Sequence, residues 1–398
     1  MPTKTKHTKK PKLRFHGFSG EWEEKKLGEV ATFLDNKRIP LEKTDRMKRQ
    51  GQYPYYGASG IIDYVDEYLF DGEFILLGED GANIILRSSP LAFLAKGRFW
   101  VNNHAHVLQS NGASNAFLAT YLETLRYDKY NTGTAQPKLN VDACKKIKIN
   151  VPTPVEQQKI ADFLGSVDSL IESLNAQKTA LETYKRGMMQ KVFSQQIRFK
   201  DENGKNFSGW KKVELGNVVT FLKGKGISKD EVIENGKNEC IRYGELYTDY
   251  GEVITEIKSK TDIPANESVL SVKGDILIPS SGETVIDIAT VSCVNVDGVL
   301  LGGDLNILRP KQEQNGAFFA YYLSNFQNIN IARLAQGNSV VHLYASHLKT
   351  LKIELPSFPE QEKIADFLIS LDNLIESKQE QVTKAEQWKK GLMQKMFV

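Results

Sequence analysis

The chain has 398 residues, of which 40% are hydrophobic and 25% charged, and its formal net charge is +3. These values are typical of a folded protein with two or three domains, and they exclude a disordered or strongly basic chain. The three cysteines, Cys144, Cys240 and Cys293, form no CxxC pair, so the sequence indicates neither a disulfide framework nor a cysteine zinc site.

The chain begins with a basic segment, which we predict to be a tail over residues 1–17. It carries Lys and Arg without any acidic residue, and no apolar stretch follows it, so it does not resemble a secretory signal. No run approaches the roughly 20 apolar residues that a membrane-spanning helix needs. We therefore expect a cytoplasmic protein with reduced, buried thiols.

Residues 18–151 are predicted to form a first globular domain. Short runs typical of strands, such as YPYYGASGIIDYV and FWVNNHAHVL, are separated by Gly, Asn and Asp, and a helical NAFLATYLETL follows. This pattern favours a mixed α/β domain over a regular series of βαβ units.

Residues 152–193 are predicted to form a long helix. Pro152 and Pro154 mark its start, where proline is tolerated. From Ile160 to Val192 the seam positions, mostly apolar, follow alternating steps of four and three residues, which is the spacing of a coiled-coil seam.

The second half of the chain repeats this order, with a globular domain over residues 194–355 and a helix over residues 356–398. At a constant offset of 204, residues 152–193 and 356–397 align without a gap and share 24 of 42 residues. Weaker repeats, such as FSGEWEEKKLGEVATFL against FSGWKKVELGNVVTFL, lie in the domains. We therefore predict a mixed α+β fold with an internal pseudo-twofold repeat, in which two long antiparallel coiled-coil helices join the two domains.

The segments EQQKIADFL and EQEKIADFL, the GLMQKMF type of helix end, and CIRYGELYTDYG in the second domain carry a resemblance to a known family. Over nearly its whole length the chain resembles the specificity subunit of type I restriction–modification systems. The resemblance implies that each globular part is a target recognition domain for one half of a bipartite, asymmetric site in double-stranded DNA. It also implies that the helices set the spacer and bind two modification (methyltransferase) subunits, to which restriction subunits are added. S-adenosylmethionine, ATP and Mg would then be bound by the partner subunits, and this chain would hold no cofactor.

Motifs that would indicate catalysis are missing from the sequence. It contains neither an NPPY-type motif for a flipped adenine nor a GxxxxGK[ST] phosphate loop. His104 and His106 share one face of a strand, but no third metal ligand can be identified from the sequence. We therefore predict a chain that is not an enzyme and has no metal site.

Residues that read DNA are expected on loops that a rigid domain positions. Amide, hydroxyl, aromatic and cationic side chains beside glycine-containing turns are the candidates, although for each one an ordinary loop or core role is the alternative. In the first domain they are Tyr55, Tyr56, Gly57, Ser59, Asn102, Asn103, His104, Gln136 and Lys138. In the second domain they are Lys223, Lys225, Arg242, Tyr243, Ser280, Ser281, Ser339 and His342.

Polar residues that recur in both helices are predicted to contact the partner, since a solvated surface has no need to be the same in both copies. They are Glu156, Gln157, Lys159, Asp162, Lys185 and Gln190, with Glu360, Gln361, Lys363, Asp366, Lys389 and Gln394 at the matching positions. The competing interpretation of the whole chain is a coiled-coil scaffold whose two domains bind ligands other than DNA.

Overall fold

The computed structural model describes residues 9–112, 114–311, 313–337 and 340–398, which form two compact units. Unit 1 comprises Met1–Asn175 with Glu380–Val398, and unit 2 comprises Ala176–Gln379. Each unit therefore contains one globular domain together with a part of each long helix.

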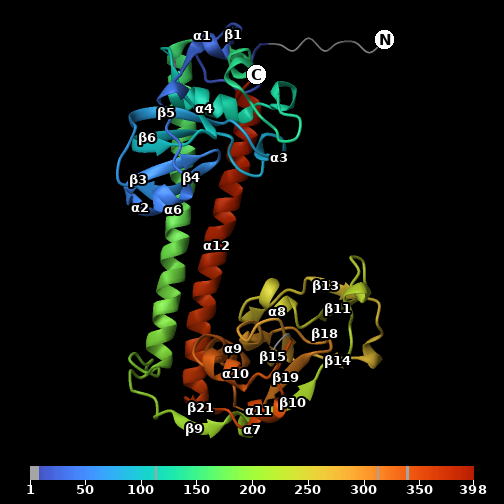
Figure 1. Ribbon diagram of the computed structural model, residues 1–398. Coiled ribbons are helices and arrows are strands. Elements are labelled where there is room, and N and C mark those ends of the chain that lie inside the picture. The colour runs from blue at the N-terminus through green and yellow to red at the C-terminus, as the bar shows by residue number, and fades with distance from the viewer. Residues whose placement is uncertain (1–8, 113, 312, 338–339) are drawn as a thin grey trace. The chain divides into compact units, whose positions relative to one another are not determined.

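The two long helices are α6 (Pro154–Phe193) and α12 (Phe358–Met396), and both are uninterrupted (Figure 1). Each begins two residues after the predicted start. In unit 1, Leu174 of α6 packs with Val382 and Ala385 of α12, and Asp168 pairs with Lys389. Because residue numbers rise along one helix as they fall along the other, the pairing is antiparallel, as predicted. None of the helices in the described ranges is long and apolar enough to cross a bilayer.

Domain 1, the globular part of unit 1, is built around one sheet in the order β2-β7-β5-β6-β3-β4 and a ribbon of β1 and β8. Its strands are β1 (Glu23–Lys26), β2 (Ala31–Phe33), β3 (Gln50–Gly57), β4 (Gly60–Val65), β5 (Phe70–Gly78), β6 (Ala92–Val101), β7 (Ala105–Ser110) and β8 (Lys148–Val151). Its helices are α1 (Leu27–Val30), α2 (Lys43–Lys48), α3 (Asn83–Leu86), α4 (Asn115–Thr124) and α5 (Val141–Lys145).

Domain 2, the globular part of unit 2, has sheets in the orders β10-β19-β15-β17-β12 and β13-β11-β18-β14, and ribbons β16-β20 and β21-β9. Its strands are β9 (Lys211–Glu214), β10 (Val219–Lys223), β11 (Asn238–Ile241), β12 (Val253–Ile254), β13 (Ser259–Thr261), β14 (Val269–Leu270), β15 (Asp275–Pro279), β16 (Ser281–Gly282), β17 (Ser292–Val294), β18 (Leu300–Leu301), β19 (Leu305–Pro310), β20 (Val341–His342) and β21 (Lys352–Leu355). Its helices are α7 (Leu215–Val218), α8 (Glu245–Thr248), α9 (Gly316–Asn325), α10 (Asn328–Leu334) and α11 (Ala345–Lys349).

The two domains share a frame of antiparallel strands. The order β2-β7-β5 in domain 1 corresponds to β10-β19-β15 in domain 2, and β1-β8 corresponds to β9-β21. Strand β2 pairs Phe33 with Leu108, and β10 pairs Phe221 with Leu308. The other strands differ in number and order, which agrees with the divergence of the two sequences inside the domains.

Aromatic side chains join each domain to a helix end. In unit 1, Phe397 at the end of α12 packs against Trp22 and Phe117. In unit 2, Phe193 at the end of α6 packs in the same way against Phe318, with Trp210 beside that ring. These large apolar surfaces are buried in one core per unit, so that each domain is fixed firmly to the helices.

Candidate nucleic-acid interface

Three loops of domain 1 meet where the strands of its sheet end. The β6–β7 turn joins the β3–β4 turn, because the backbone N–H of Asn102 donates to the Tyr56 carbonyl at 3.0 Å. The segment after β5 lies beside it, since the Glu79 N–H donates to the His104 carbonyl at 2.8 Å. Leu139 of the loop at residues 131–139 donates in turn to the Glu79 carbonyl at 2.7 Å. The structure thus brings the predicted residues of domain 1 to one end of the sheet.

The loop at residues 131–139 is closed by its own polar groups. Asn131 Oδ1 accepts hydrogen bonds from the backbone N–H groups of Gly133 and Lys138, at 3.0 and 2.8 Å. A Cβ atom at Gly133 would lie 1.8 Å from the Gln136 carbonyl oxygen, so that only glycine fits this turn. Gly337, which lies 204 residues later in domain 2, meets the same restriction.

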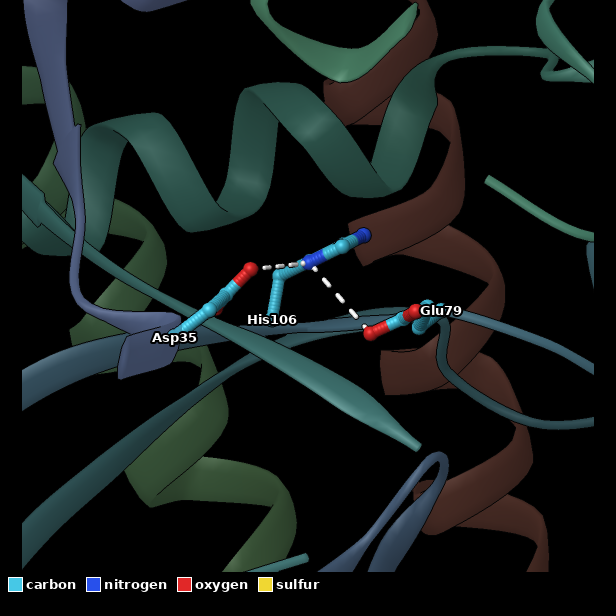
Figure 2. Close-up of side chains that lie close together, drawn as sticks. All are labelled: Asp35, Glu79 and His106. Carbon is cyan, nitrogen blue, oxygen red and sulfur yellow. Dashed lines mark hydrogen bonds and ion pairs between the residues drawn. The ribbon is translucent and has the colours of Figure 1, made fainter. Parts of the chain in front are cut away.

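A group of charged side chains, most of them partly buried, is centred on the buried His106 (Figure 2). His106 Nδ1 is 2.6 Å from an Asp35 carboxylate oxygen and 3.6 Å from Glu79. Arg38 donates to Glu79 at 2.8 Å, and Lys138 of the loop approaches the same carboxylate at 3.3 Å. The network thereby links the loop to the end of β5 and to strand β7.

Both ring nitrogens of His106 face acceptors, because Nε2 lies 2.7 Å from the Leu139 carbonyl oxygen and Nδ1 faces Asp35. Only the imidazolium, with two N–H donors, satisfies both contacts. Burial alone would lower the pKa of His106, but the hydrogen bonds and charges of Asp35 and Cys144 outweigh it, and the pKa rises to about 10.

Asp35, Glu79 and His106 also offer ligand atoms within 4.8 Å of one another, a spacing that suits a metal ion. The two carboxylates already face three positive charges, however, on Arg38, Lys138 and the imidazolium. A divalent cation would have to displace the imidazolium proton and lie among the two remaining cations. The group is therefore a charge network, and we propose no metal here. His104, the other candidate ligand of the sequence, pairs with Asp80 instead.

The strand ends of domain 2 meet in the same way. The Ser280 N–H donates to the Asp304 carbonyl at 2.7 Å, and the Leu343 N–H donates to the Ser280 carbonyl at 3.0 Å. Lys223, Ser280 and His342 line one cavity of about 340 Å³. Lys225 follows β10, and its N–H donates to the Leu301 carbonyl at 3.1 Å. Ser339 lies outside the described residues.

The predicted DNA-contacting residues differ in accessibility. Ser59, Asn103, His104, Gln136, Lys138, Lys223, Lys225 and His342 are exposed, whereas Tyr56, Arg242, Tyr243 and Ser280 are partly buried. Four positions need a correction: Tyr55, Gly57, Asn102 and Ser281 are buried. Tyr55 packs against Val65 and Trp100, and Asn102 Oδ1 accepts the His104 N–H at 2.8 Å. These residues shape the interface from below it.

The repeated polar residues at the helix starts are used inside the chain, which corrects their interpretation as a partner surface. Arg14 donates twice to Glu156, both times at 2.7 Å, and Arg198 donates twice to Glu360, at 3.1 and 2.6 Å. Both carboxylates are only 1% exposed. Gln157 and Gln361, also buried, donate to the Pro152 and Pro356 carbonyls at their helix starts. We call the two Arg–Glu pairs the helix-start clamps.

The repeated lysines also have contacts within their own units. Lys185 bridges Asp372 at 2.6 Å and Glu252 at 3.2 Å, and Lys389 pairs with Asp168. Lys159 and Lys363 lie over the rings of Phe15 and Phe207. The repeated residues that are exposed are Lys159, Asp162, Gln190, Asp366 and Gln394.

A family of type I restriction–modification DNA specificity domains matches the chain twice, over residues 19–183 and 207–387. The chain belongs to this family. The two matches place one specificity domain in each half, as the internal repeat predicts.

Two specificity subunits and one solved structure resemble the chain over most of its length. A putative type I restriction enzyme specificity subunit of Haemophilus influenzae is 30% identical over 91% of this chain and 90% of its own. The MjaVIII specificity subunit of Methanocaldococcus jannaschii is 26% identical over 94% and 91%. The crystal structure of an S subunit from M. genitalium shares the fold, with a TM-score of 0.65 and 18% identity over 98% and 99% of the two chains.

Sequence reasoning missed two features of this specificity-family chain. The first is the repeated Arg of the clamps: RF occurs at residues 14–15 and 198–199, but the distance from it to the following FSG differs. The second is a set of exposed apolar residues at matching positions of the helices. Leu170 and Leu374 are 46% and 51% exposed, and Tyr184 and Trp388 are 51% and 50% exposed. The offset of 204 relates Leu170 to Leu374 and Tyr184 to Trp388, but it does not show that these side chains are exposed.

Proposed function

We propose that each domain of this specificity subunit reads one half of a bipartite DNA site through the loops at its strand ends, and that the helices hold two methyltransferase subunits. One observation carries the proposal. The same frame appears twice and presents loops at the same end, while the side chains on those loops differ. Such an arrangement suits one mode of binding used on two different sequences.

The exposed side chains at the strand ends have the chemistry that DNA recognition needs. Lys138, Lys223 and Lys225 are exposed cations that suit phosphate contacts. Asn103 and Gln136 are exposed amides, which can donate to and accept from base edges at the same time. In domain 1, the cation Lys138 and the amides Asn103 and Gln136 are therefore exposed in the loops at one end of the sheet.

The surface for the methyltransferase subunits is assigned to the exposed apolar residues of the helices. Unit 1 presents Leu170 with Trp388, whose ring contacts Phe163 at 6.1 Å between centroids. Unit 2 presents Leu374 with Tyr184 at the matching positions. We call these the helix patches. A large apolar residue that is half exposed in both copies suits a protein partner, and an equal pair of patches suits two copies of that partner.

The chemistry is assigned to the partners in this proposal. S-adenosylmethionine would bind to the methyltransferase subunits and ATP with Mg to the restriction subunits, and adenine would be the methylated base. This chain provides the sequence specificity, because it determines which DNA sequence is held beside each methyltransferase.

Sequencing with detection of modified bases tests the proposal. The chain is expressed with its cognate methyltransferase subunit in a host without other modification enzymes. The expected result is one methylated motif of two unlike halves, separated by a spacer of fixed length. Methylation without any sequence preference would contradict the proposal, and absence of methylation together with DNA-independent binding of another ligand would favour the scaffold interpretation.

The role of the helices is tested separately. Residues are inserted into the seam between Leu164 and Leu181, with a matching insertion in α12. The spacer of the methylated motif should then change, while both half-sites stay the same. A change in the bases of either half-site would contradict the division of labour between helices and domains.

A further inference from the structure

In each domain, one buried polar side chain donates a hydrogen bond to the equivalent loop. His106 of β7 donates from Nε2 to the Leu139 carbonyl at 2.7 Å, and Asn306 of β19 donates from Nδ2 to the Leu343 carbonyl at 2.9 Å. The two donors are 0% and 3% exposed. Leu139 and Leu343 are separated by 204 residues, the offset of the repeat.

The backbone around these two bonds is equivalent as well. The N–H of Leu139 donates to the Glu79 carbonyl, and the N–H of Leu343 donates to the Ser280 carbonyl. The loops are closed by matching bonds from Thr132 to the Lys138 carbonyl, at 2.7 Å, and from Gln336 to the His342 carbonyl, at 2.9 Å. Each loop is thus fixed by the same set of bonds, of which a single one comes from a side chain of the central strands.

The surroundings of the two donors differ. Asp35, just after β2, pairs with His106, whereas the register of β10 places Lys223 opposite Asn306. Glu79 is matched by Ser280. Domain 1 therefore fills the space below the loop with charges, and domain 2 leaves the cavity of about 340 Å³. The shared element is the donor to the loop carbonyl, and the charge network is particular to domain 1.

We propose that His106 and Asn306 are positioning residues for DNA recognition, each of which holds its loop in the conformation that meets one half-site. The loops are residues 131–139, which carry Gln136 and Lys138, and the described residues 336–337 and 340–343, which carry His342. Without the donor, a buried carbonyl group loses its partner, and the loop relaxes toward water. This inference rests on the proposed function, because the loops are taken to contact DNA.

The test uses the complete complex with methyltransferase subunits and compares the variants His106→Leu and Asn306→Leu. Initial methylation rates are measured on a duplex with the intact site and on duplexes with one base pair changed in either half. His106→Leu should lower discrimination in one half by about tenfold, which is the contribution of roughly one good base contact. Discrimination in the other half should stay unchanged, and Asn306→Leu should give the reverse pattern.

A conservative variant separates positioning from simple packing. Asn306 reaches the equivalent carbonyl in domain 2, so His106→Asn should keep most of the discrimination that His106→Leu loses. Hydrogen exchange of the free chain gives a second measure that does not need an assembled complex. Amides of residues 131–140 should exchange faster in His106→Leu, and those of residues 340–344 should not.

Three results would overturn the inference: equal loss in both halves, no difference between the Leu and Asn variants, or unchanged exchange of the loop. The failure of the proposed function looks different. In that case the wild-type complex itself shows no sequence preference, whatever the variants do.

Discussion

Domain 1 and domain 2 each fix an equivalent loop to an equivalent strand end. Domain 1 does so with a buried imidazolium, and domain 2 with an amide. In domain 1, Asp35 and Glu79 surround His106, and two further cations face the carboxylates. In domain 2, Asn306 needs no charge and lies beside an open cavity. The difference teaches that backbone geometry is the constant part of this fold. The side chains around it vary freely, provided that every buried polar group is paired.

The helices show the opposite behaviour, since they repeat their side chains as well as their geometry. The helix-start clamps recur with the same residue types and the same bidentate geometry. The proposed function accounts for this contrast, because it gives the domains two unlike DNA sequences and the helices two like subunits.

The largest expected effect is a loss of stability on breaking a helix-start clamp, and it tests whether the two clamps contribute equally. Replacing Glu156 or Glu360 by Ala leaves a partly buried Arg without its carboxylate. Breaking such a pair costs about 3–5 kcal/mol of unfolding free energy. Urea unfolding of each variant measures the loss, and Glu172→Ala, an exposed helix position, is the control. A loss at one clamp without a similar loss at the other would show that the two halves are not equivalent.

The next prediction uses pH to test the difference between the two positioning residues, His106 and Asn306. The pKa of His106 is raised from 6.5 to about 10 in the folded state, so the folded state binds its proton more tightly. Its stabilising effect is complete below pH 6.5, falls as the pH rises, and is lost above pH 10. The slope for one proton is about 1.4 kcal/mol per pH unit.

Urea unfolding between pH 6.5 and 10 measures this slope. The wild-type chain should lose more stability over that range than His106→Asn, which carries the neutral residue of domain 2. Equal pH dependence of the two chains would mean that His106 is not charged in the folded state.

A smaller effect is expected at the helix patches, where the two halves should behave alike. Trp388→Ser and Tyr184→Ser each remove a half-exposed aromatic ring from one patch. Each should weaken methyltransferase binding by about tenfold, or ~1.4 kcal/mol, as measured by titration calorimetry. The stability of the free chain should change little. Unaltered binding in both variants would place the partner on another surface.

The sequence predicted the architecture well, because a repeat with constant offset needs no knowledge of contacts. The antiparallel helices, their limits to within two residues and the positions of the loops follow from periodicity and from the matching segments. The roles of single side chains could not be predicted in the same way. Glu156 and Gln157 look like surface residues in a helix, and only the fold brings Arg14 and the Pro152 carbonyl to them.

The charge network was also beyond the sequence. The sequence predicts one strand that carries both His104 and His106, but His104 precedes β7, and Asp35 and Glu79 lie 71 and 27 residues away from His106 along the chain. Only the pairing of β7 with β2 and β5 brings them together. Burial was equally invisible in the sequence: Tyr55 lies in β3 and Asn102 directly follows β6, and both side chains are buried.

A chain with two copies of domain 1 tests the central claim most directly. Residues 14–153 are placed in the position of residues 198–357, so that both junctions fall at equivalent residues of the clamps and helix starts. Modified-base sequencing of the complex should then find a symmetric motif, in which both halves are the half-site of domain 1 in inverted orientation. A motif that keeps the original second half would contradict the claim that unlike loops on a shared frame read the two unlike halves.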